Sequence, residues 1–209
     1  MSSTPEPPAQ QPTAAEGHPA APVWNLPNVL TMVRIVLVPV FVLLLWQDTT
    51  GTALGALAVF LVAAATDKLD GTIARRRGIV TNFGKIADPF ADKLLTGAAM
   101  VVLSVMDVMP WWATIIILVR EIGITVLRFV MVRRSVMAAS NGGKLKTVLQ
   151  IVFLSMMMMF PAMALFPDPL GDWWQTVAYV IMLLAAAVTV VTGLDYCWRA
   201  WRIVREQKA

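Results

Sequence analysis

Long apolar stretches, separated by short polar connections, occupy most of the chain. Extended at their ends by small or weakly polar residues, they approach the roughly 20 residues that a helix needs to cross a bilayer core of about 30 Å. The pattern predicts helices over residues 28–46, 51–77, 82–106, 110–134, 143–166 and 172–201. We therefore expect an all-α integral membrane protein with six transmembrane helices that contact membrane lipids.

The composition supports this prediction. Of the 209 residues, 58% are hydrophobic and only 14% are charged, whereas a soluble domain carries about 25% charged residues. An ordinary soluble globular protein is therefore excluded. Cys197 is the only cysteine and His18 the only histidine, so a disulfide framework and a cysteine-rich metal site are excluded within one chain. Acid–base or metal chemistry must depend on other side chains.

The N-terminal segment differs from the rest of the chain. Residues 1–22 contain six prolines among Ala, Ser, Thr and Gln, and they contain no Lys or Arg. Such a segment buries too little apolar surface to offset the entropy lost on ordering. We expect a disordered tail over residues 1–22, followed by one six-helix domain over residues 23–209.

Basic residues gather at alternate connections between the predicted helices. The second-to-third connection, the fourth-to-fifth connection and the C-terminus carry four each, and the other connections carry none. They are Arg75, Arg76, Arg77 and Lys85; Arg133, Arg134, Lys144 and Lys146; and Arg199, Arg202, Arg205 and Lys208. Cytoplasmic flanks of transmembrane helices accumulate Lys and Arg, so we expect both termini in the cytoplasm and a plasma (inner) membrane location. The net charge of +4 is then mainly a topology signal, and no nucleic-acid partner is expected.

Four aspartates lie at the end of the second predicted helix and the start of the third. Asp67 and Asp70 share one helix face, and Asp88 and Asp92 are i,i+4 neighbours. A short connection makes the two helices antiparallel neighbours, so the four carboxylates can converge in a polar cavity at the cytoplasmic side. They would repel one another unless a positive ion neutralises them, and their oxygens suit Mg²⁺ or Mn²⁺. An ion or proton pathway lined by these acids is the competing interpretation.

The aspartates belong to a longer pattern. It reads Asp67-x2-Asp70-Gly71-x2-Ala74-Arg75-x8-Gly84-x3-Asp88-x3-Asp92. This pattern resembles the signature of the CDP-alcohol phosphatidyltransferases at all eight positions. The resemblance implies a six-helix membrane enzyme, usually a homodimer. Such an enzyme attacks the β-phosphorus of a CDP-linked lipid with an alcohol and releases CMP.

The resemblance also implies roles for the four carboxylates. Asp67, Asp70 and Asp88 resemble the family's ligands for two divalent cations. Asp92 resembles the catalytic residue that takes the proton from the attacking hydroxyl while also touching a metal. A metal-linked carboxylate is a credible base in a chain that offers no histidine within the predicted helices. Two ions held by shared carboxylates would stabilise both the attacking and the leaving oxygen at phosphorus.

The remaining signature residues are small or basic. By resemblance they would line the site for the CDP-lipid: Gly71, Ala74, Arg75 and Gly84. Thr31, on the first predicted helix, is a further candidate contact of the CDP-lipid, although a threonine can also bond only its own helix backbone. Arg34, one turn later, either contributes to this region or is a cation that extends from the helix to the membrane surface.

Four cationic side chains indicate the chemical class of the acceptor alcohol. Arg120 and Arg128 lie eight positions apart, on nearly one face of the fourth predicted helix, and Lys144 and Lys146 lie at the glycine-opened start of the fifth. This combination suits an anionic phosphate on the acceptor. The neighbouring Glu121 either binds the acceptor or forms a structural ion pair with Arg120 or another basic residue.

Three short patterns resemble the glycerol-3-phosphate-using branch of the family, the phosphatidylglycerophosphate synthases. They are Asn28-x2-Thr31-x2-Arg34-x4-Pro39, Arg120-Glu121 and Gly143-Lys144-x-Lys146-Thr147. This resemblance implies CDP-diacylglycerol and sn-glycerol 3-phosphate as substrates and phosphatidylglycerophosphate as product. The alternatives are a sister activity that uses inositol phosphate or, as cardiolipin synthases do, phosphatidylglycerol, and, from another class, an ion transporter or channel.

Overall fold

The computed structural model describes residues 26–77, 82–131, 141–163, 165 and 170–206, and in these ranges every regular element is a helix. The helices are α1 (Leu26–Trp46), α2 (Thr50–Arg77), α3 (Asn82–Val105), α4 (Trp111–Met131), α5 (Asn141–Met158), α6 (Phe160–Met163) and α7 (Leu170–Glu206). The predicted all-α class is confirmed for this part of the chain. The predicted disordered tail over residues 1–22 lies outside the described residues.

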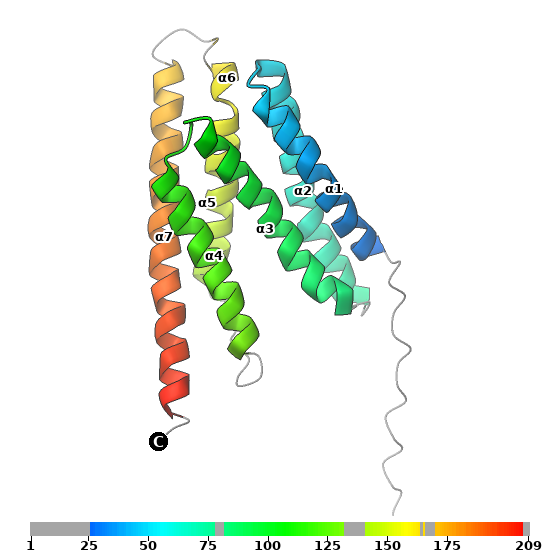
Figure 1. Ribbon diagram of the computed structural model, residues 1–209, viewed down its shortest axis with the longest axis vertical. Coiled ribbons are helices and arrows are strands. Elements are labelled where there is room, and N and C mark those ends of the chain that lie inside the picture. The colour runs from blue at the N-terminus through cyan, green and yellow to red at the C-terminus, as the bar shows by residue number, and fades with distance from the viewer. Residues whose placement is uncertain (1–25, 78–81, 132–140, 164, 166–169, 207–209) are drawn as a thin grey trace, which may run out of the picture.

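The helices form two neighbouring groups (Figure 1). Helix α1 packs along α2 and α3, and α7 packs along α5 and α4. Successive long helices run in opposite directions, so the connections from α1 to α2 and from α3 to α4 lie at the same end of the bundle. The last residues of α2, α4 and α7 lie toward the opposite end. This opposite end is called the basic end below, because the predicted basic connections belong to it.

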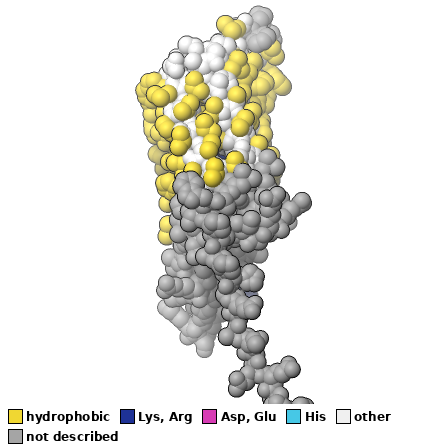
Figure 2. Space-filling model, turned by 90° about the vertical axis from the view of Figure 1, so that its right-hand side faces the viewer, with side chains coloured by type: hydrophobic (Ala, Val, Ile, Leu, Met, Phe, Trp, Pro, Cys, Tyr) yellow, Lys and Arg dark blue, Asp and Glu magenta, His cyan; other side chains and the backbone are white. Residues whose placement is uncertain are grey.

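Apolar side chains cover outward-facing surfaces of the bundle. Figure 2 shows hydrophobic side chains spread over the described part of one face. Five large aliphatic side chains are each 66% exposed: Val36, Leu43, Val119, Val191 and Leu194. Monomeric soluble proteins rarely expose extended apolar patches. The outer surface is therefore suited to lipid.

Among the described residues, two helical segments are long and apolar enough to cross a membrane. They are Asn28–Trp46 in α1 and Leu170–Ile203 in α7. Shorter apolar segments occupy Thr50–Thr66, Lys93–Val105 and Leu145–Met158. Length and composition thus agree with a membrane protein, while the number of spans stays a prediction.

The expected continuous helix over residues 143–166 is wrong. Helix α5 ends at Met158, and the single turn α6 follows after Met159. Pro161 explains the break, because proline has no amide hydrogen for the carbonyl of Met157 and its ring would clash with that carbonyl. At the break, the Trp174 indole of α7 donates a 2.9 Å hydrogen bond to the Met156 carbonyl.

Two aspartates form the tight turns at the end of the bundle opposite the basic end. Asp48 follows α1 with φ of 50°, and Asp107 follows α3 with φ of 58°. Asp tolerates this left-handed conformation better than most side chains. After α3, the Val108 amide donates to the Leu103 carbonyl at 2.9 Å, a bond typical of a helix C-terminal cap. Both aspartates therefore take the left-handed conformation at the residue where the chain reverses direction.

Buried contacts fix the helices that carry the predicted site. The Phe41 and Phe60 rings, 6.0 Å apart between centroids, join α1 to α2. The Ser104 and Thr114 hydroxyls, 2.6 Å apart and buried, join α3 to α4. A single hydrogen bond between buried hydroxyls is directional, so it sets the relative rotation of α3 and α4 as well as their separation.

Candidate active site

The four predicted metal-binding aspartates lie in the halves of two neighbouring helices closest to the basic end. Asp67 and Asp70 belong to α2, and Asp88 and Asp92 belong to α3. Helices α2 and α3 contact each other. The side chains of all four aspartates lie outside the described part of the structure. Their roles therefore stay predictions, although their helix positions match the expected arrangement.

The roles of six other predicted site residues also stay predictions. Their side chains also lie outside the described residues: Gly71, Ala74, Arg75, Gly84, Arg128 and Lys144. Three predicted residues do have described side chains, namely Thr31, Arg120 and Lys146. The candidate site is therefore built from these three and from the residues around them.

A cavity of about 60 Å³ lies between five helices. It is lined by Arg34, Ala63, Ala64, Leu95, Thr96, Glu121, Lys146, Thr147, Gln150 and Ile151. Residues three and four apart share a helix face. Ala63 and Ala64 precede Asp67 by this spacing, and Leu95 and Thr96 follow Asp92 by it. The cavity thus lies about one helical turn from the positions of Asp67 and Asp92.

A buried ion pair forms part of this cavity wall. Lys146 Nζ of α5 lies 2.5 Å from Glu121 Oε1 of α4, and the two side chains are 7% and 10% exposed. Of the alternatives for Glu121, an ion pair with a basic residue other than Arg120 is thus confirmed. The acceptor-binding alternative stays open, because an ion-paired carboxylate can still accept further hydrogen bonds.

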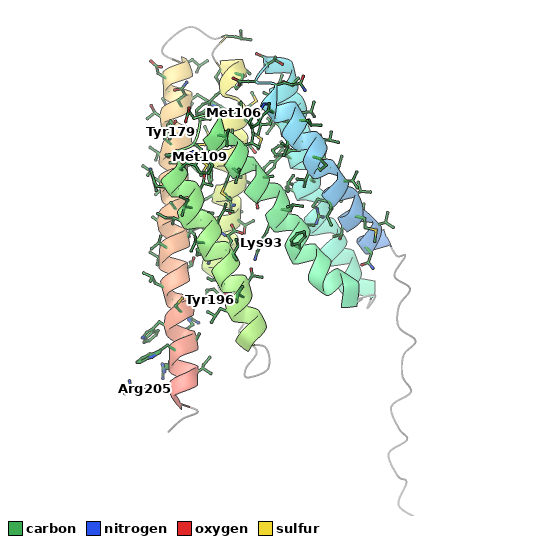
Figure 3. All side chains as sticks on the ribbon, in the orientation of Figure 1. Lys93, Met106, Met109, Tyr179, Tyr196 and Arg205 are labelled. Carbon is green, nitrogen blue, oxygen red and sulfur yellow. The ribbon has the colours of Figure 1, made fainter. Side chains whose placement is uncertain are left out.

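Lys93 brings α3 into the same network. Its Nζ donates a 3.2 Å hydrogen bond to the backbone carbonyl of Glu121. Figure 3 shows Lys93 on the side of α3 that faces α4 and α5. Sequence reasoning missed this contact, because nothing in the spacing of the charged residues predicts a lysine bonded to a carbonyl of another helix.

The Arg120 side chain contacts α7, whereas Lys146 lines the cavity. Its Nη2 donates a 2.8 Å hydrogen bond to Thr192 Oγ1 of α7. The aliphatic part of Arg120 passes so close to Gly193 that a Cβ there would lie 3.0 Å from Arg120 Cγ. Arg120 is not among the described residues that line the 60 Å³ cavity. The described contacts therefore do not bring Arg120 and Lys146 together.

Helix α1 contributes a buried polar stripe. Asn28, Thr31 and Arg34, spaced three residues apart, are 3%, 0% and 2% exposed. Arg34 lines the cavity, so the alternative that it extends to the membrane surface is wrong. Burial places Thr31 in the bundle interior, which agrees with a ligand-facing position but does not identify its ligand.

Comparison with known proteins decides the family. The family model of the CDP-alcohol phosphatidyltransferases matches residues 24–191. This chain belongs to the CDP-alcohol phosphatidyltransferase family. The matched range includes every predicted site residue, from Thr31 to Lys146. The protein is therefore a membrane-bound phosphatidyltransferase.

Several phosphatidyltransferases are similar over nearly their whole length. A probable phosphatidylglycerophosphate synthase of Mycobacterium tuberculosis (strain H37Rv) is 43% identical over 195 residues, covering 92% of this chain and 89% of that protein. A CDP-diacylglycerol--glycerol-3-phosphate 3-phosphatidyltransferase of Bacillus subtilis is 34% identical, covering 88% and 98%. One of the same name from Shigella flexneri serotype 5b is 36% identical, covering 83% and 93%.

Proposed function

We propose that this protein transfers the phosphatidyl group from CDP-diacylglycerol to sn-glycerol 3-phosphate and produces phosphatidylglycerophosphate and CMP. The observation that carries the proposal is the similarity, over most of both chains, to relatives named for this reaction or for its product. The complete family signature and the basic residues on α4 and α5 agree with it.

The chemistry is a displacement at phosphorus. Asp92 takes the proton from the 1-hydroxyl of glycerol 3-phosphate, and the oxygen attacks the β-phosphorus of CDP-diacylglycerol. A new phosphorus–oxygen bond forms to glycerol, and the bond from the β-phosphorus to the bridging oxygen breaks. That oxygen leaves as part of CMP. A positioned base of this kind contributes about 10²- to 10⁴-fold to a rate.

Divalent cations fit the donor set of α2 and α3. Asp67, Asp70, Asp88 and Asp92 supply only carboxylate oxygens, the ligands that Mg²⁺ and Mn²⁺ prefer. The two helices that carry them are in contact. We propose that these residues hold two such ions. When bound, the ions offset the negative charge that develops on the attacking and leaving oxygens.

The two substrates occupy neighbouring regions in this proposal. Gly71, Ala74, Arg75 and Gly84 line the site for the CDP-lipid, together with Thr31. Four cations bind the acceptor phosphate: Arg120, Arg128, Lys144 and Lys146. Lys146 lines the 60 Å³ cavity, and this position supports its part in the set because a cation on a cavity wall can contact a phosphate bound there.

The membrane arrangement follows from charge and helix direction. We propose six spans, with α5 and α6 forming one, and both termini and the active site on the cytoplasmic side of the plasma membrane. The alternating helix directions (Figure 1) and the basic residues at alternate connections support this arrangement. We also propose that the enzyme is a homodimer, as is usual in the family.

An acceptor screen tests the proposed function. Purified protein with CDP-diacylglycerol and Mg²⁺ or Mn²⁺ is offered glycerol 3-phosphate, inositol phosphate or phosphatidylglycerol, and both CMP and the lipid product are measured. We expect CMP release with glycerol 3-phosphate and a product of the mass of phosphatidylglycerophosphate. Turnover only with inositol phosphate or only with phosphatidylglycerol would refute the acceptor assignment.

A further inference from the structure

Glu121 lies where three helices of the bundle meet. Its carboxylate contacts Lys146 Nζ of α5 at 2.5 Å, and its backbone carbonyl accepts a 3.2 Å hydrogen bond from Lys93 Nζ of α3. The same carbonyl accepts a 2.7 Å hydrogen bond from Thr125 Oγ1 one turn along α4. One residue therefore joins α3, α4 and α5.

The burial of this junction limits what its charges can do. With side chains 7% and 10% exposed, Lys146 and Glu121 are largely shielded from water. A buried charge without a partner is strongly unfavourable, whereas a well-formed pair offsets much of that cost. Glu121 therefore holds the Lys146 ammonium in one place. An ammonium has three donor hydrogens, so Lys146 can contact Glu121 and an acceptor phosphate at the same time.

The hydrogen bond from Lys93 of α3 connects Glu121 to the helical turn that carries the predicted base. Lys93 directly follows Asp92, and Leu95 and Thr96, which line the cavity beside Glu121, follow within the next turn. A hydrogen bond from Lys93 to the backbone of α4 restricts the rotation of α3 at this point. This hydrogen bond therefore fixes the turn of α3 that carries Asp92 relative to α4.

We propose that Glu121 is a positioning residue that places Lys146 for the acceptor phosphate and, through Lys93, aligns the turn of α3 that carries Asp92. This inference rests on the proposed function, because it takes Lys146 as part of the acceptor site and Asp92 as the base. It adds that the acceptor site and the base are aligned by one shared junction. Geometric errors of about 1 Å at such sites can cost about 100-fold in rate.

The first test separates the two contacts of Glu121. Glu121→Gln removes the charge that holds Lys146, so we expect the KM for glycerol 3-phosphate to rise about tenfold or more, while the KM for CDP-diacylglycerol changes less than about twofold. Lys93→Met removes the contact from α3, so we expect kcat to fall while both KM values change little. Asp195→Asn is the matched control, because it breaks the exposed Asp195–Arg199 pair of α7 and should leave all three constants unchanged.

A charge exchange distinguishes positioning from a purely structural role. The double variant Glu121→Lys with Lys146→Glu keeps a buried ion pair between α4 and α5. We expect it to regain thermal stability relative to the single variants, whereas the KM for glycerol 3-phosphate stays raised because a carboxylate now occupies position 146. Recovery of both stability and acceptor KM would overturn the inference.

Failure of this inference can be told apart from failure of the proposed function. If the unaltered enzyme does not use glycerol 3-phosphate in the acceptor screen, the acceptor assignment is wrong. If it does, and Glu121→Gln keeps the acceptor KM within about twofold, the positioning role is wrong. If Glu121→Gln does not fold, Glu121→Asp tests the positioning role instead, because it keeps the negative charge but moves it by the length of one methylene group. An unchanged acceptor KM in that variant overturns the proposal.

Discussion

Arg120 of α4 lies against Gly193 of α7, at a distance where an added Cβ would be 3.0 Å from Arg120 Cγ. A glycine inside a helix costs about 0.5–1 kcal/mol relative to alanine, so close packing gives a reason for its presence. The adjacent Thr192 accepts the 2.8 Å hydrogen bond from Arg120. Helix α7 therefore provides both the space and the partner that orient this arginine.

This relationship predicts the effect of filling the space at Gly193. Gly193→Val should push Arg120 from Thr192, lower stability by about 1–3 kcal/mol and raise the KM for glycerol 3-phosphate more than that for CDP-diacylglycerol. Gly123→Val is the control, because a Cβ at Gly123 of α4 meets no atom of the described residues within 4 Å. Steady-state kinetics and thermal unfolding in detergent measure both effects. Equal KM values for glycerol 3-phosphate in the two variants would show that Arg120 is not part of the acceptor site.

The buried hydroxyl pair between α3 and α4 predicts a coupled effect on stability. Ser104→Ala leaves the Thr114 hydroxyl without its 2.6 Å partner, and a buried hydroxyl without a partner costs about 1–3 kcal/mol. Thr114→Val should cost a similar amount for the same reason. The double variant should lose less unfolding free energy than the two single variants lose together, because no buried hydroxyl is then left without its partner. Unfolding free energies of the four proteins give the coupling, and strict additivity would show that the hydroxyls do not stabilise each other.

Asp92 should be needed for turnover but not for binding of the CDP-lipid. Asp92→Asn keeps the size of the side chain but cannot take a proton, so kcat should fall by about 10²- to 10⁴-fold while CDP-diacylglycerol still binds. Removal of divalent cations with EDTA should abolish turnover, and Mg²⁺ or Mn²⁺ should restore it. Asp107→Asn is the matched control at the opposite end of the bundle, where asparagine also tolerates the left-handed backbone. Near-normal turnover of Asp92→Asn would overturn the base assignment.

The long helices could be predicted from the sequence because their apolar stretches are long and their ends carry clear polar signals. The start of α2 at Thr50 and of α3 at Asn82 agree with the predicted residues 51 and 82 to within one position. The apolar run over residues 143–166 does not predict the break after α5. Pro161 lies within this run and interrupts the helix because it has no amide hydrogen. The bond from Trp174 that stabilises the break depends on the packing of α7, which local sequence does not reveal.

The sequence predicts a chemistry for the candidate site, and the structure adds contacts that the sequence does not predict. The types and spacing of the aspartates and cations indicated metal and phosphate binding. The sequence does not predict which cation pairs with Glu121, because Arg120 is adjacent in the sequence whereas Lys146 lies 25 positions away on another helix. Only the packing of the helices selects Lys146. Gly193 did carry a signal, since a glycine in a helix interior often marks close packing. Lys93 carried none, because its partner is a backbone carbonyl.

The proposed membrane sidedness predicts which ends of the bundle can be labelled from each side of the membrane. In a Cys197→Ser background, which removes the exposed native thiol, Gln47→Cys marks the turn after α1 and Arg205→Cys marks the end of α7. Because the helices alternate in direction (Figure 1) and the basic residues belong to the end of α7, a thiol reagent that cannot cross the membrane should label position 47 in intact cells. It should label position 205 only after the membrane is opened. The reverse pattern would invert the topology and place Asp92 on the outer side, away from cytoplasmic glycerol 3-phosphate. Labelling of both positions in intact cells would contradict an odd number of crossings between the two positions.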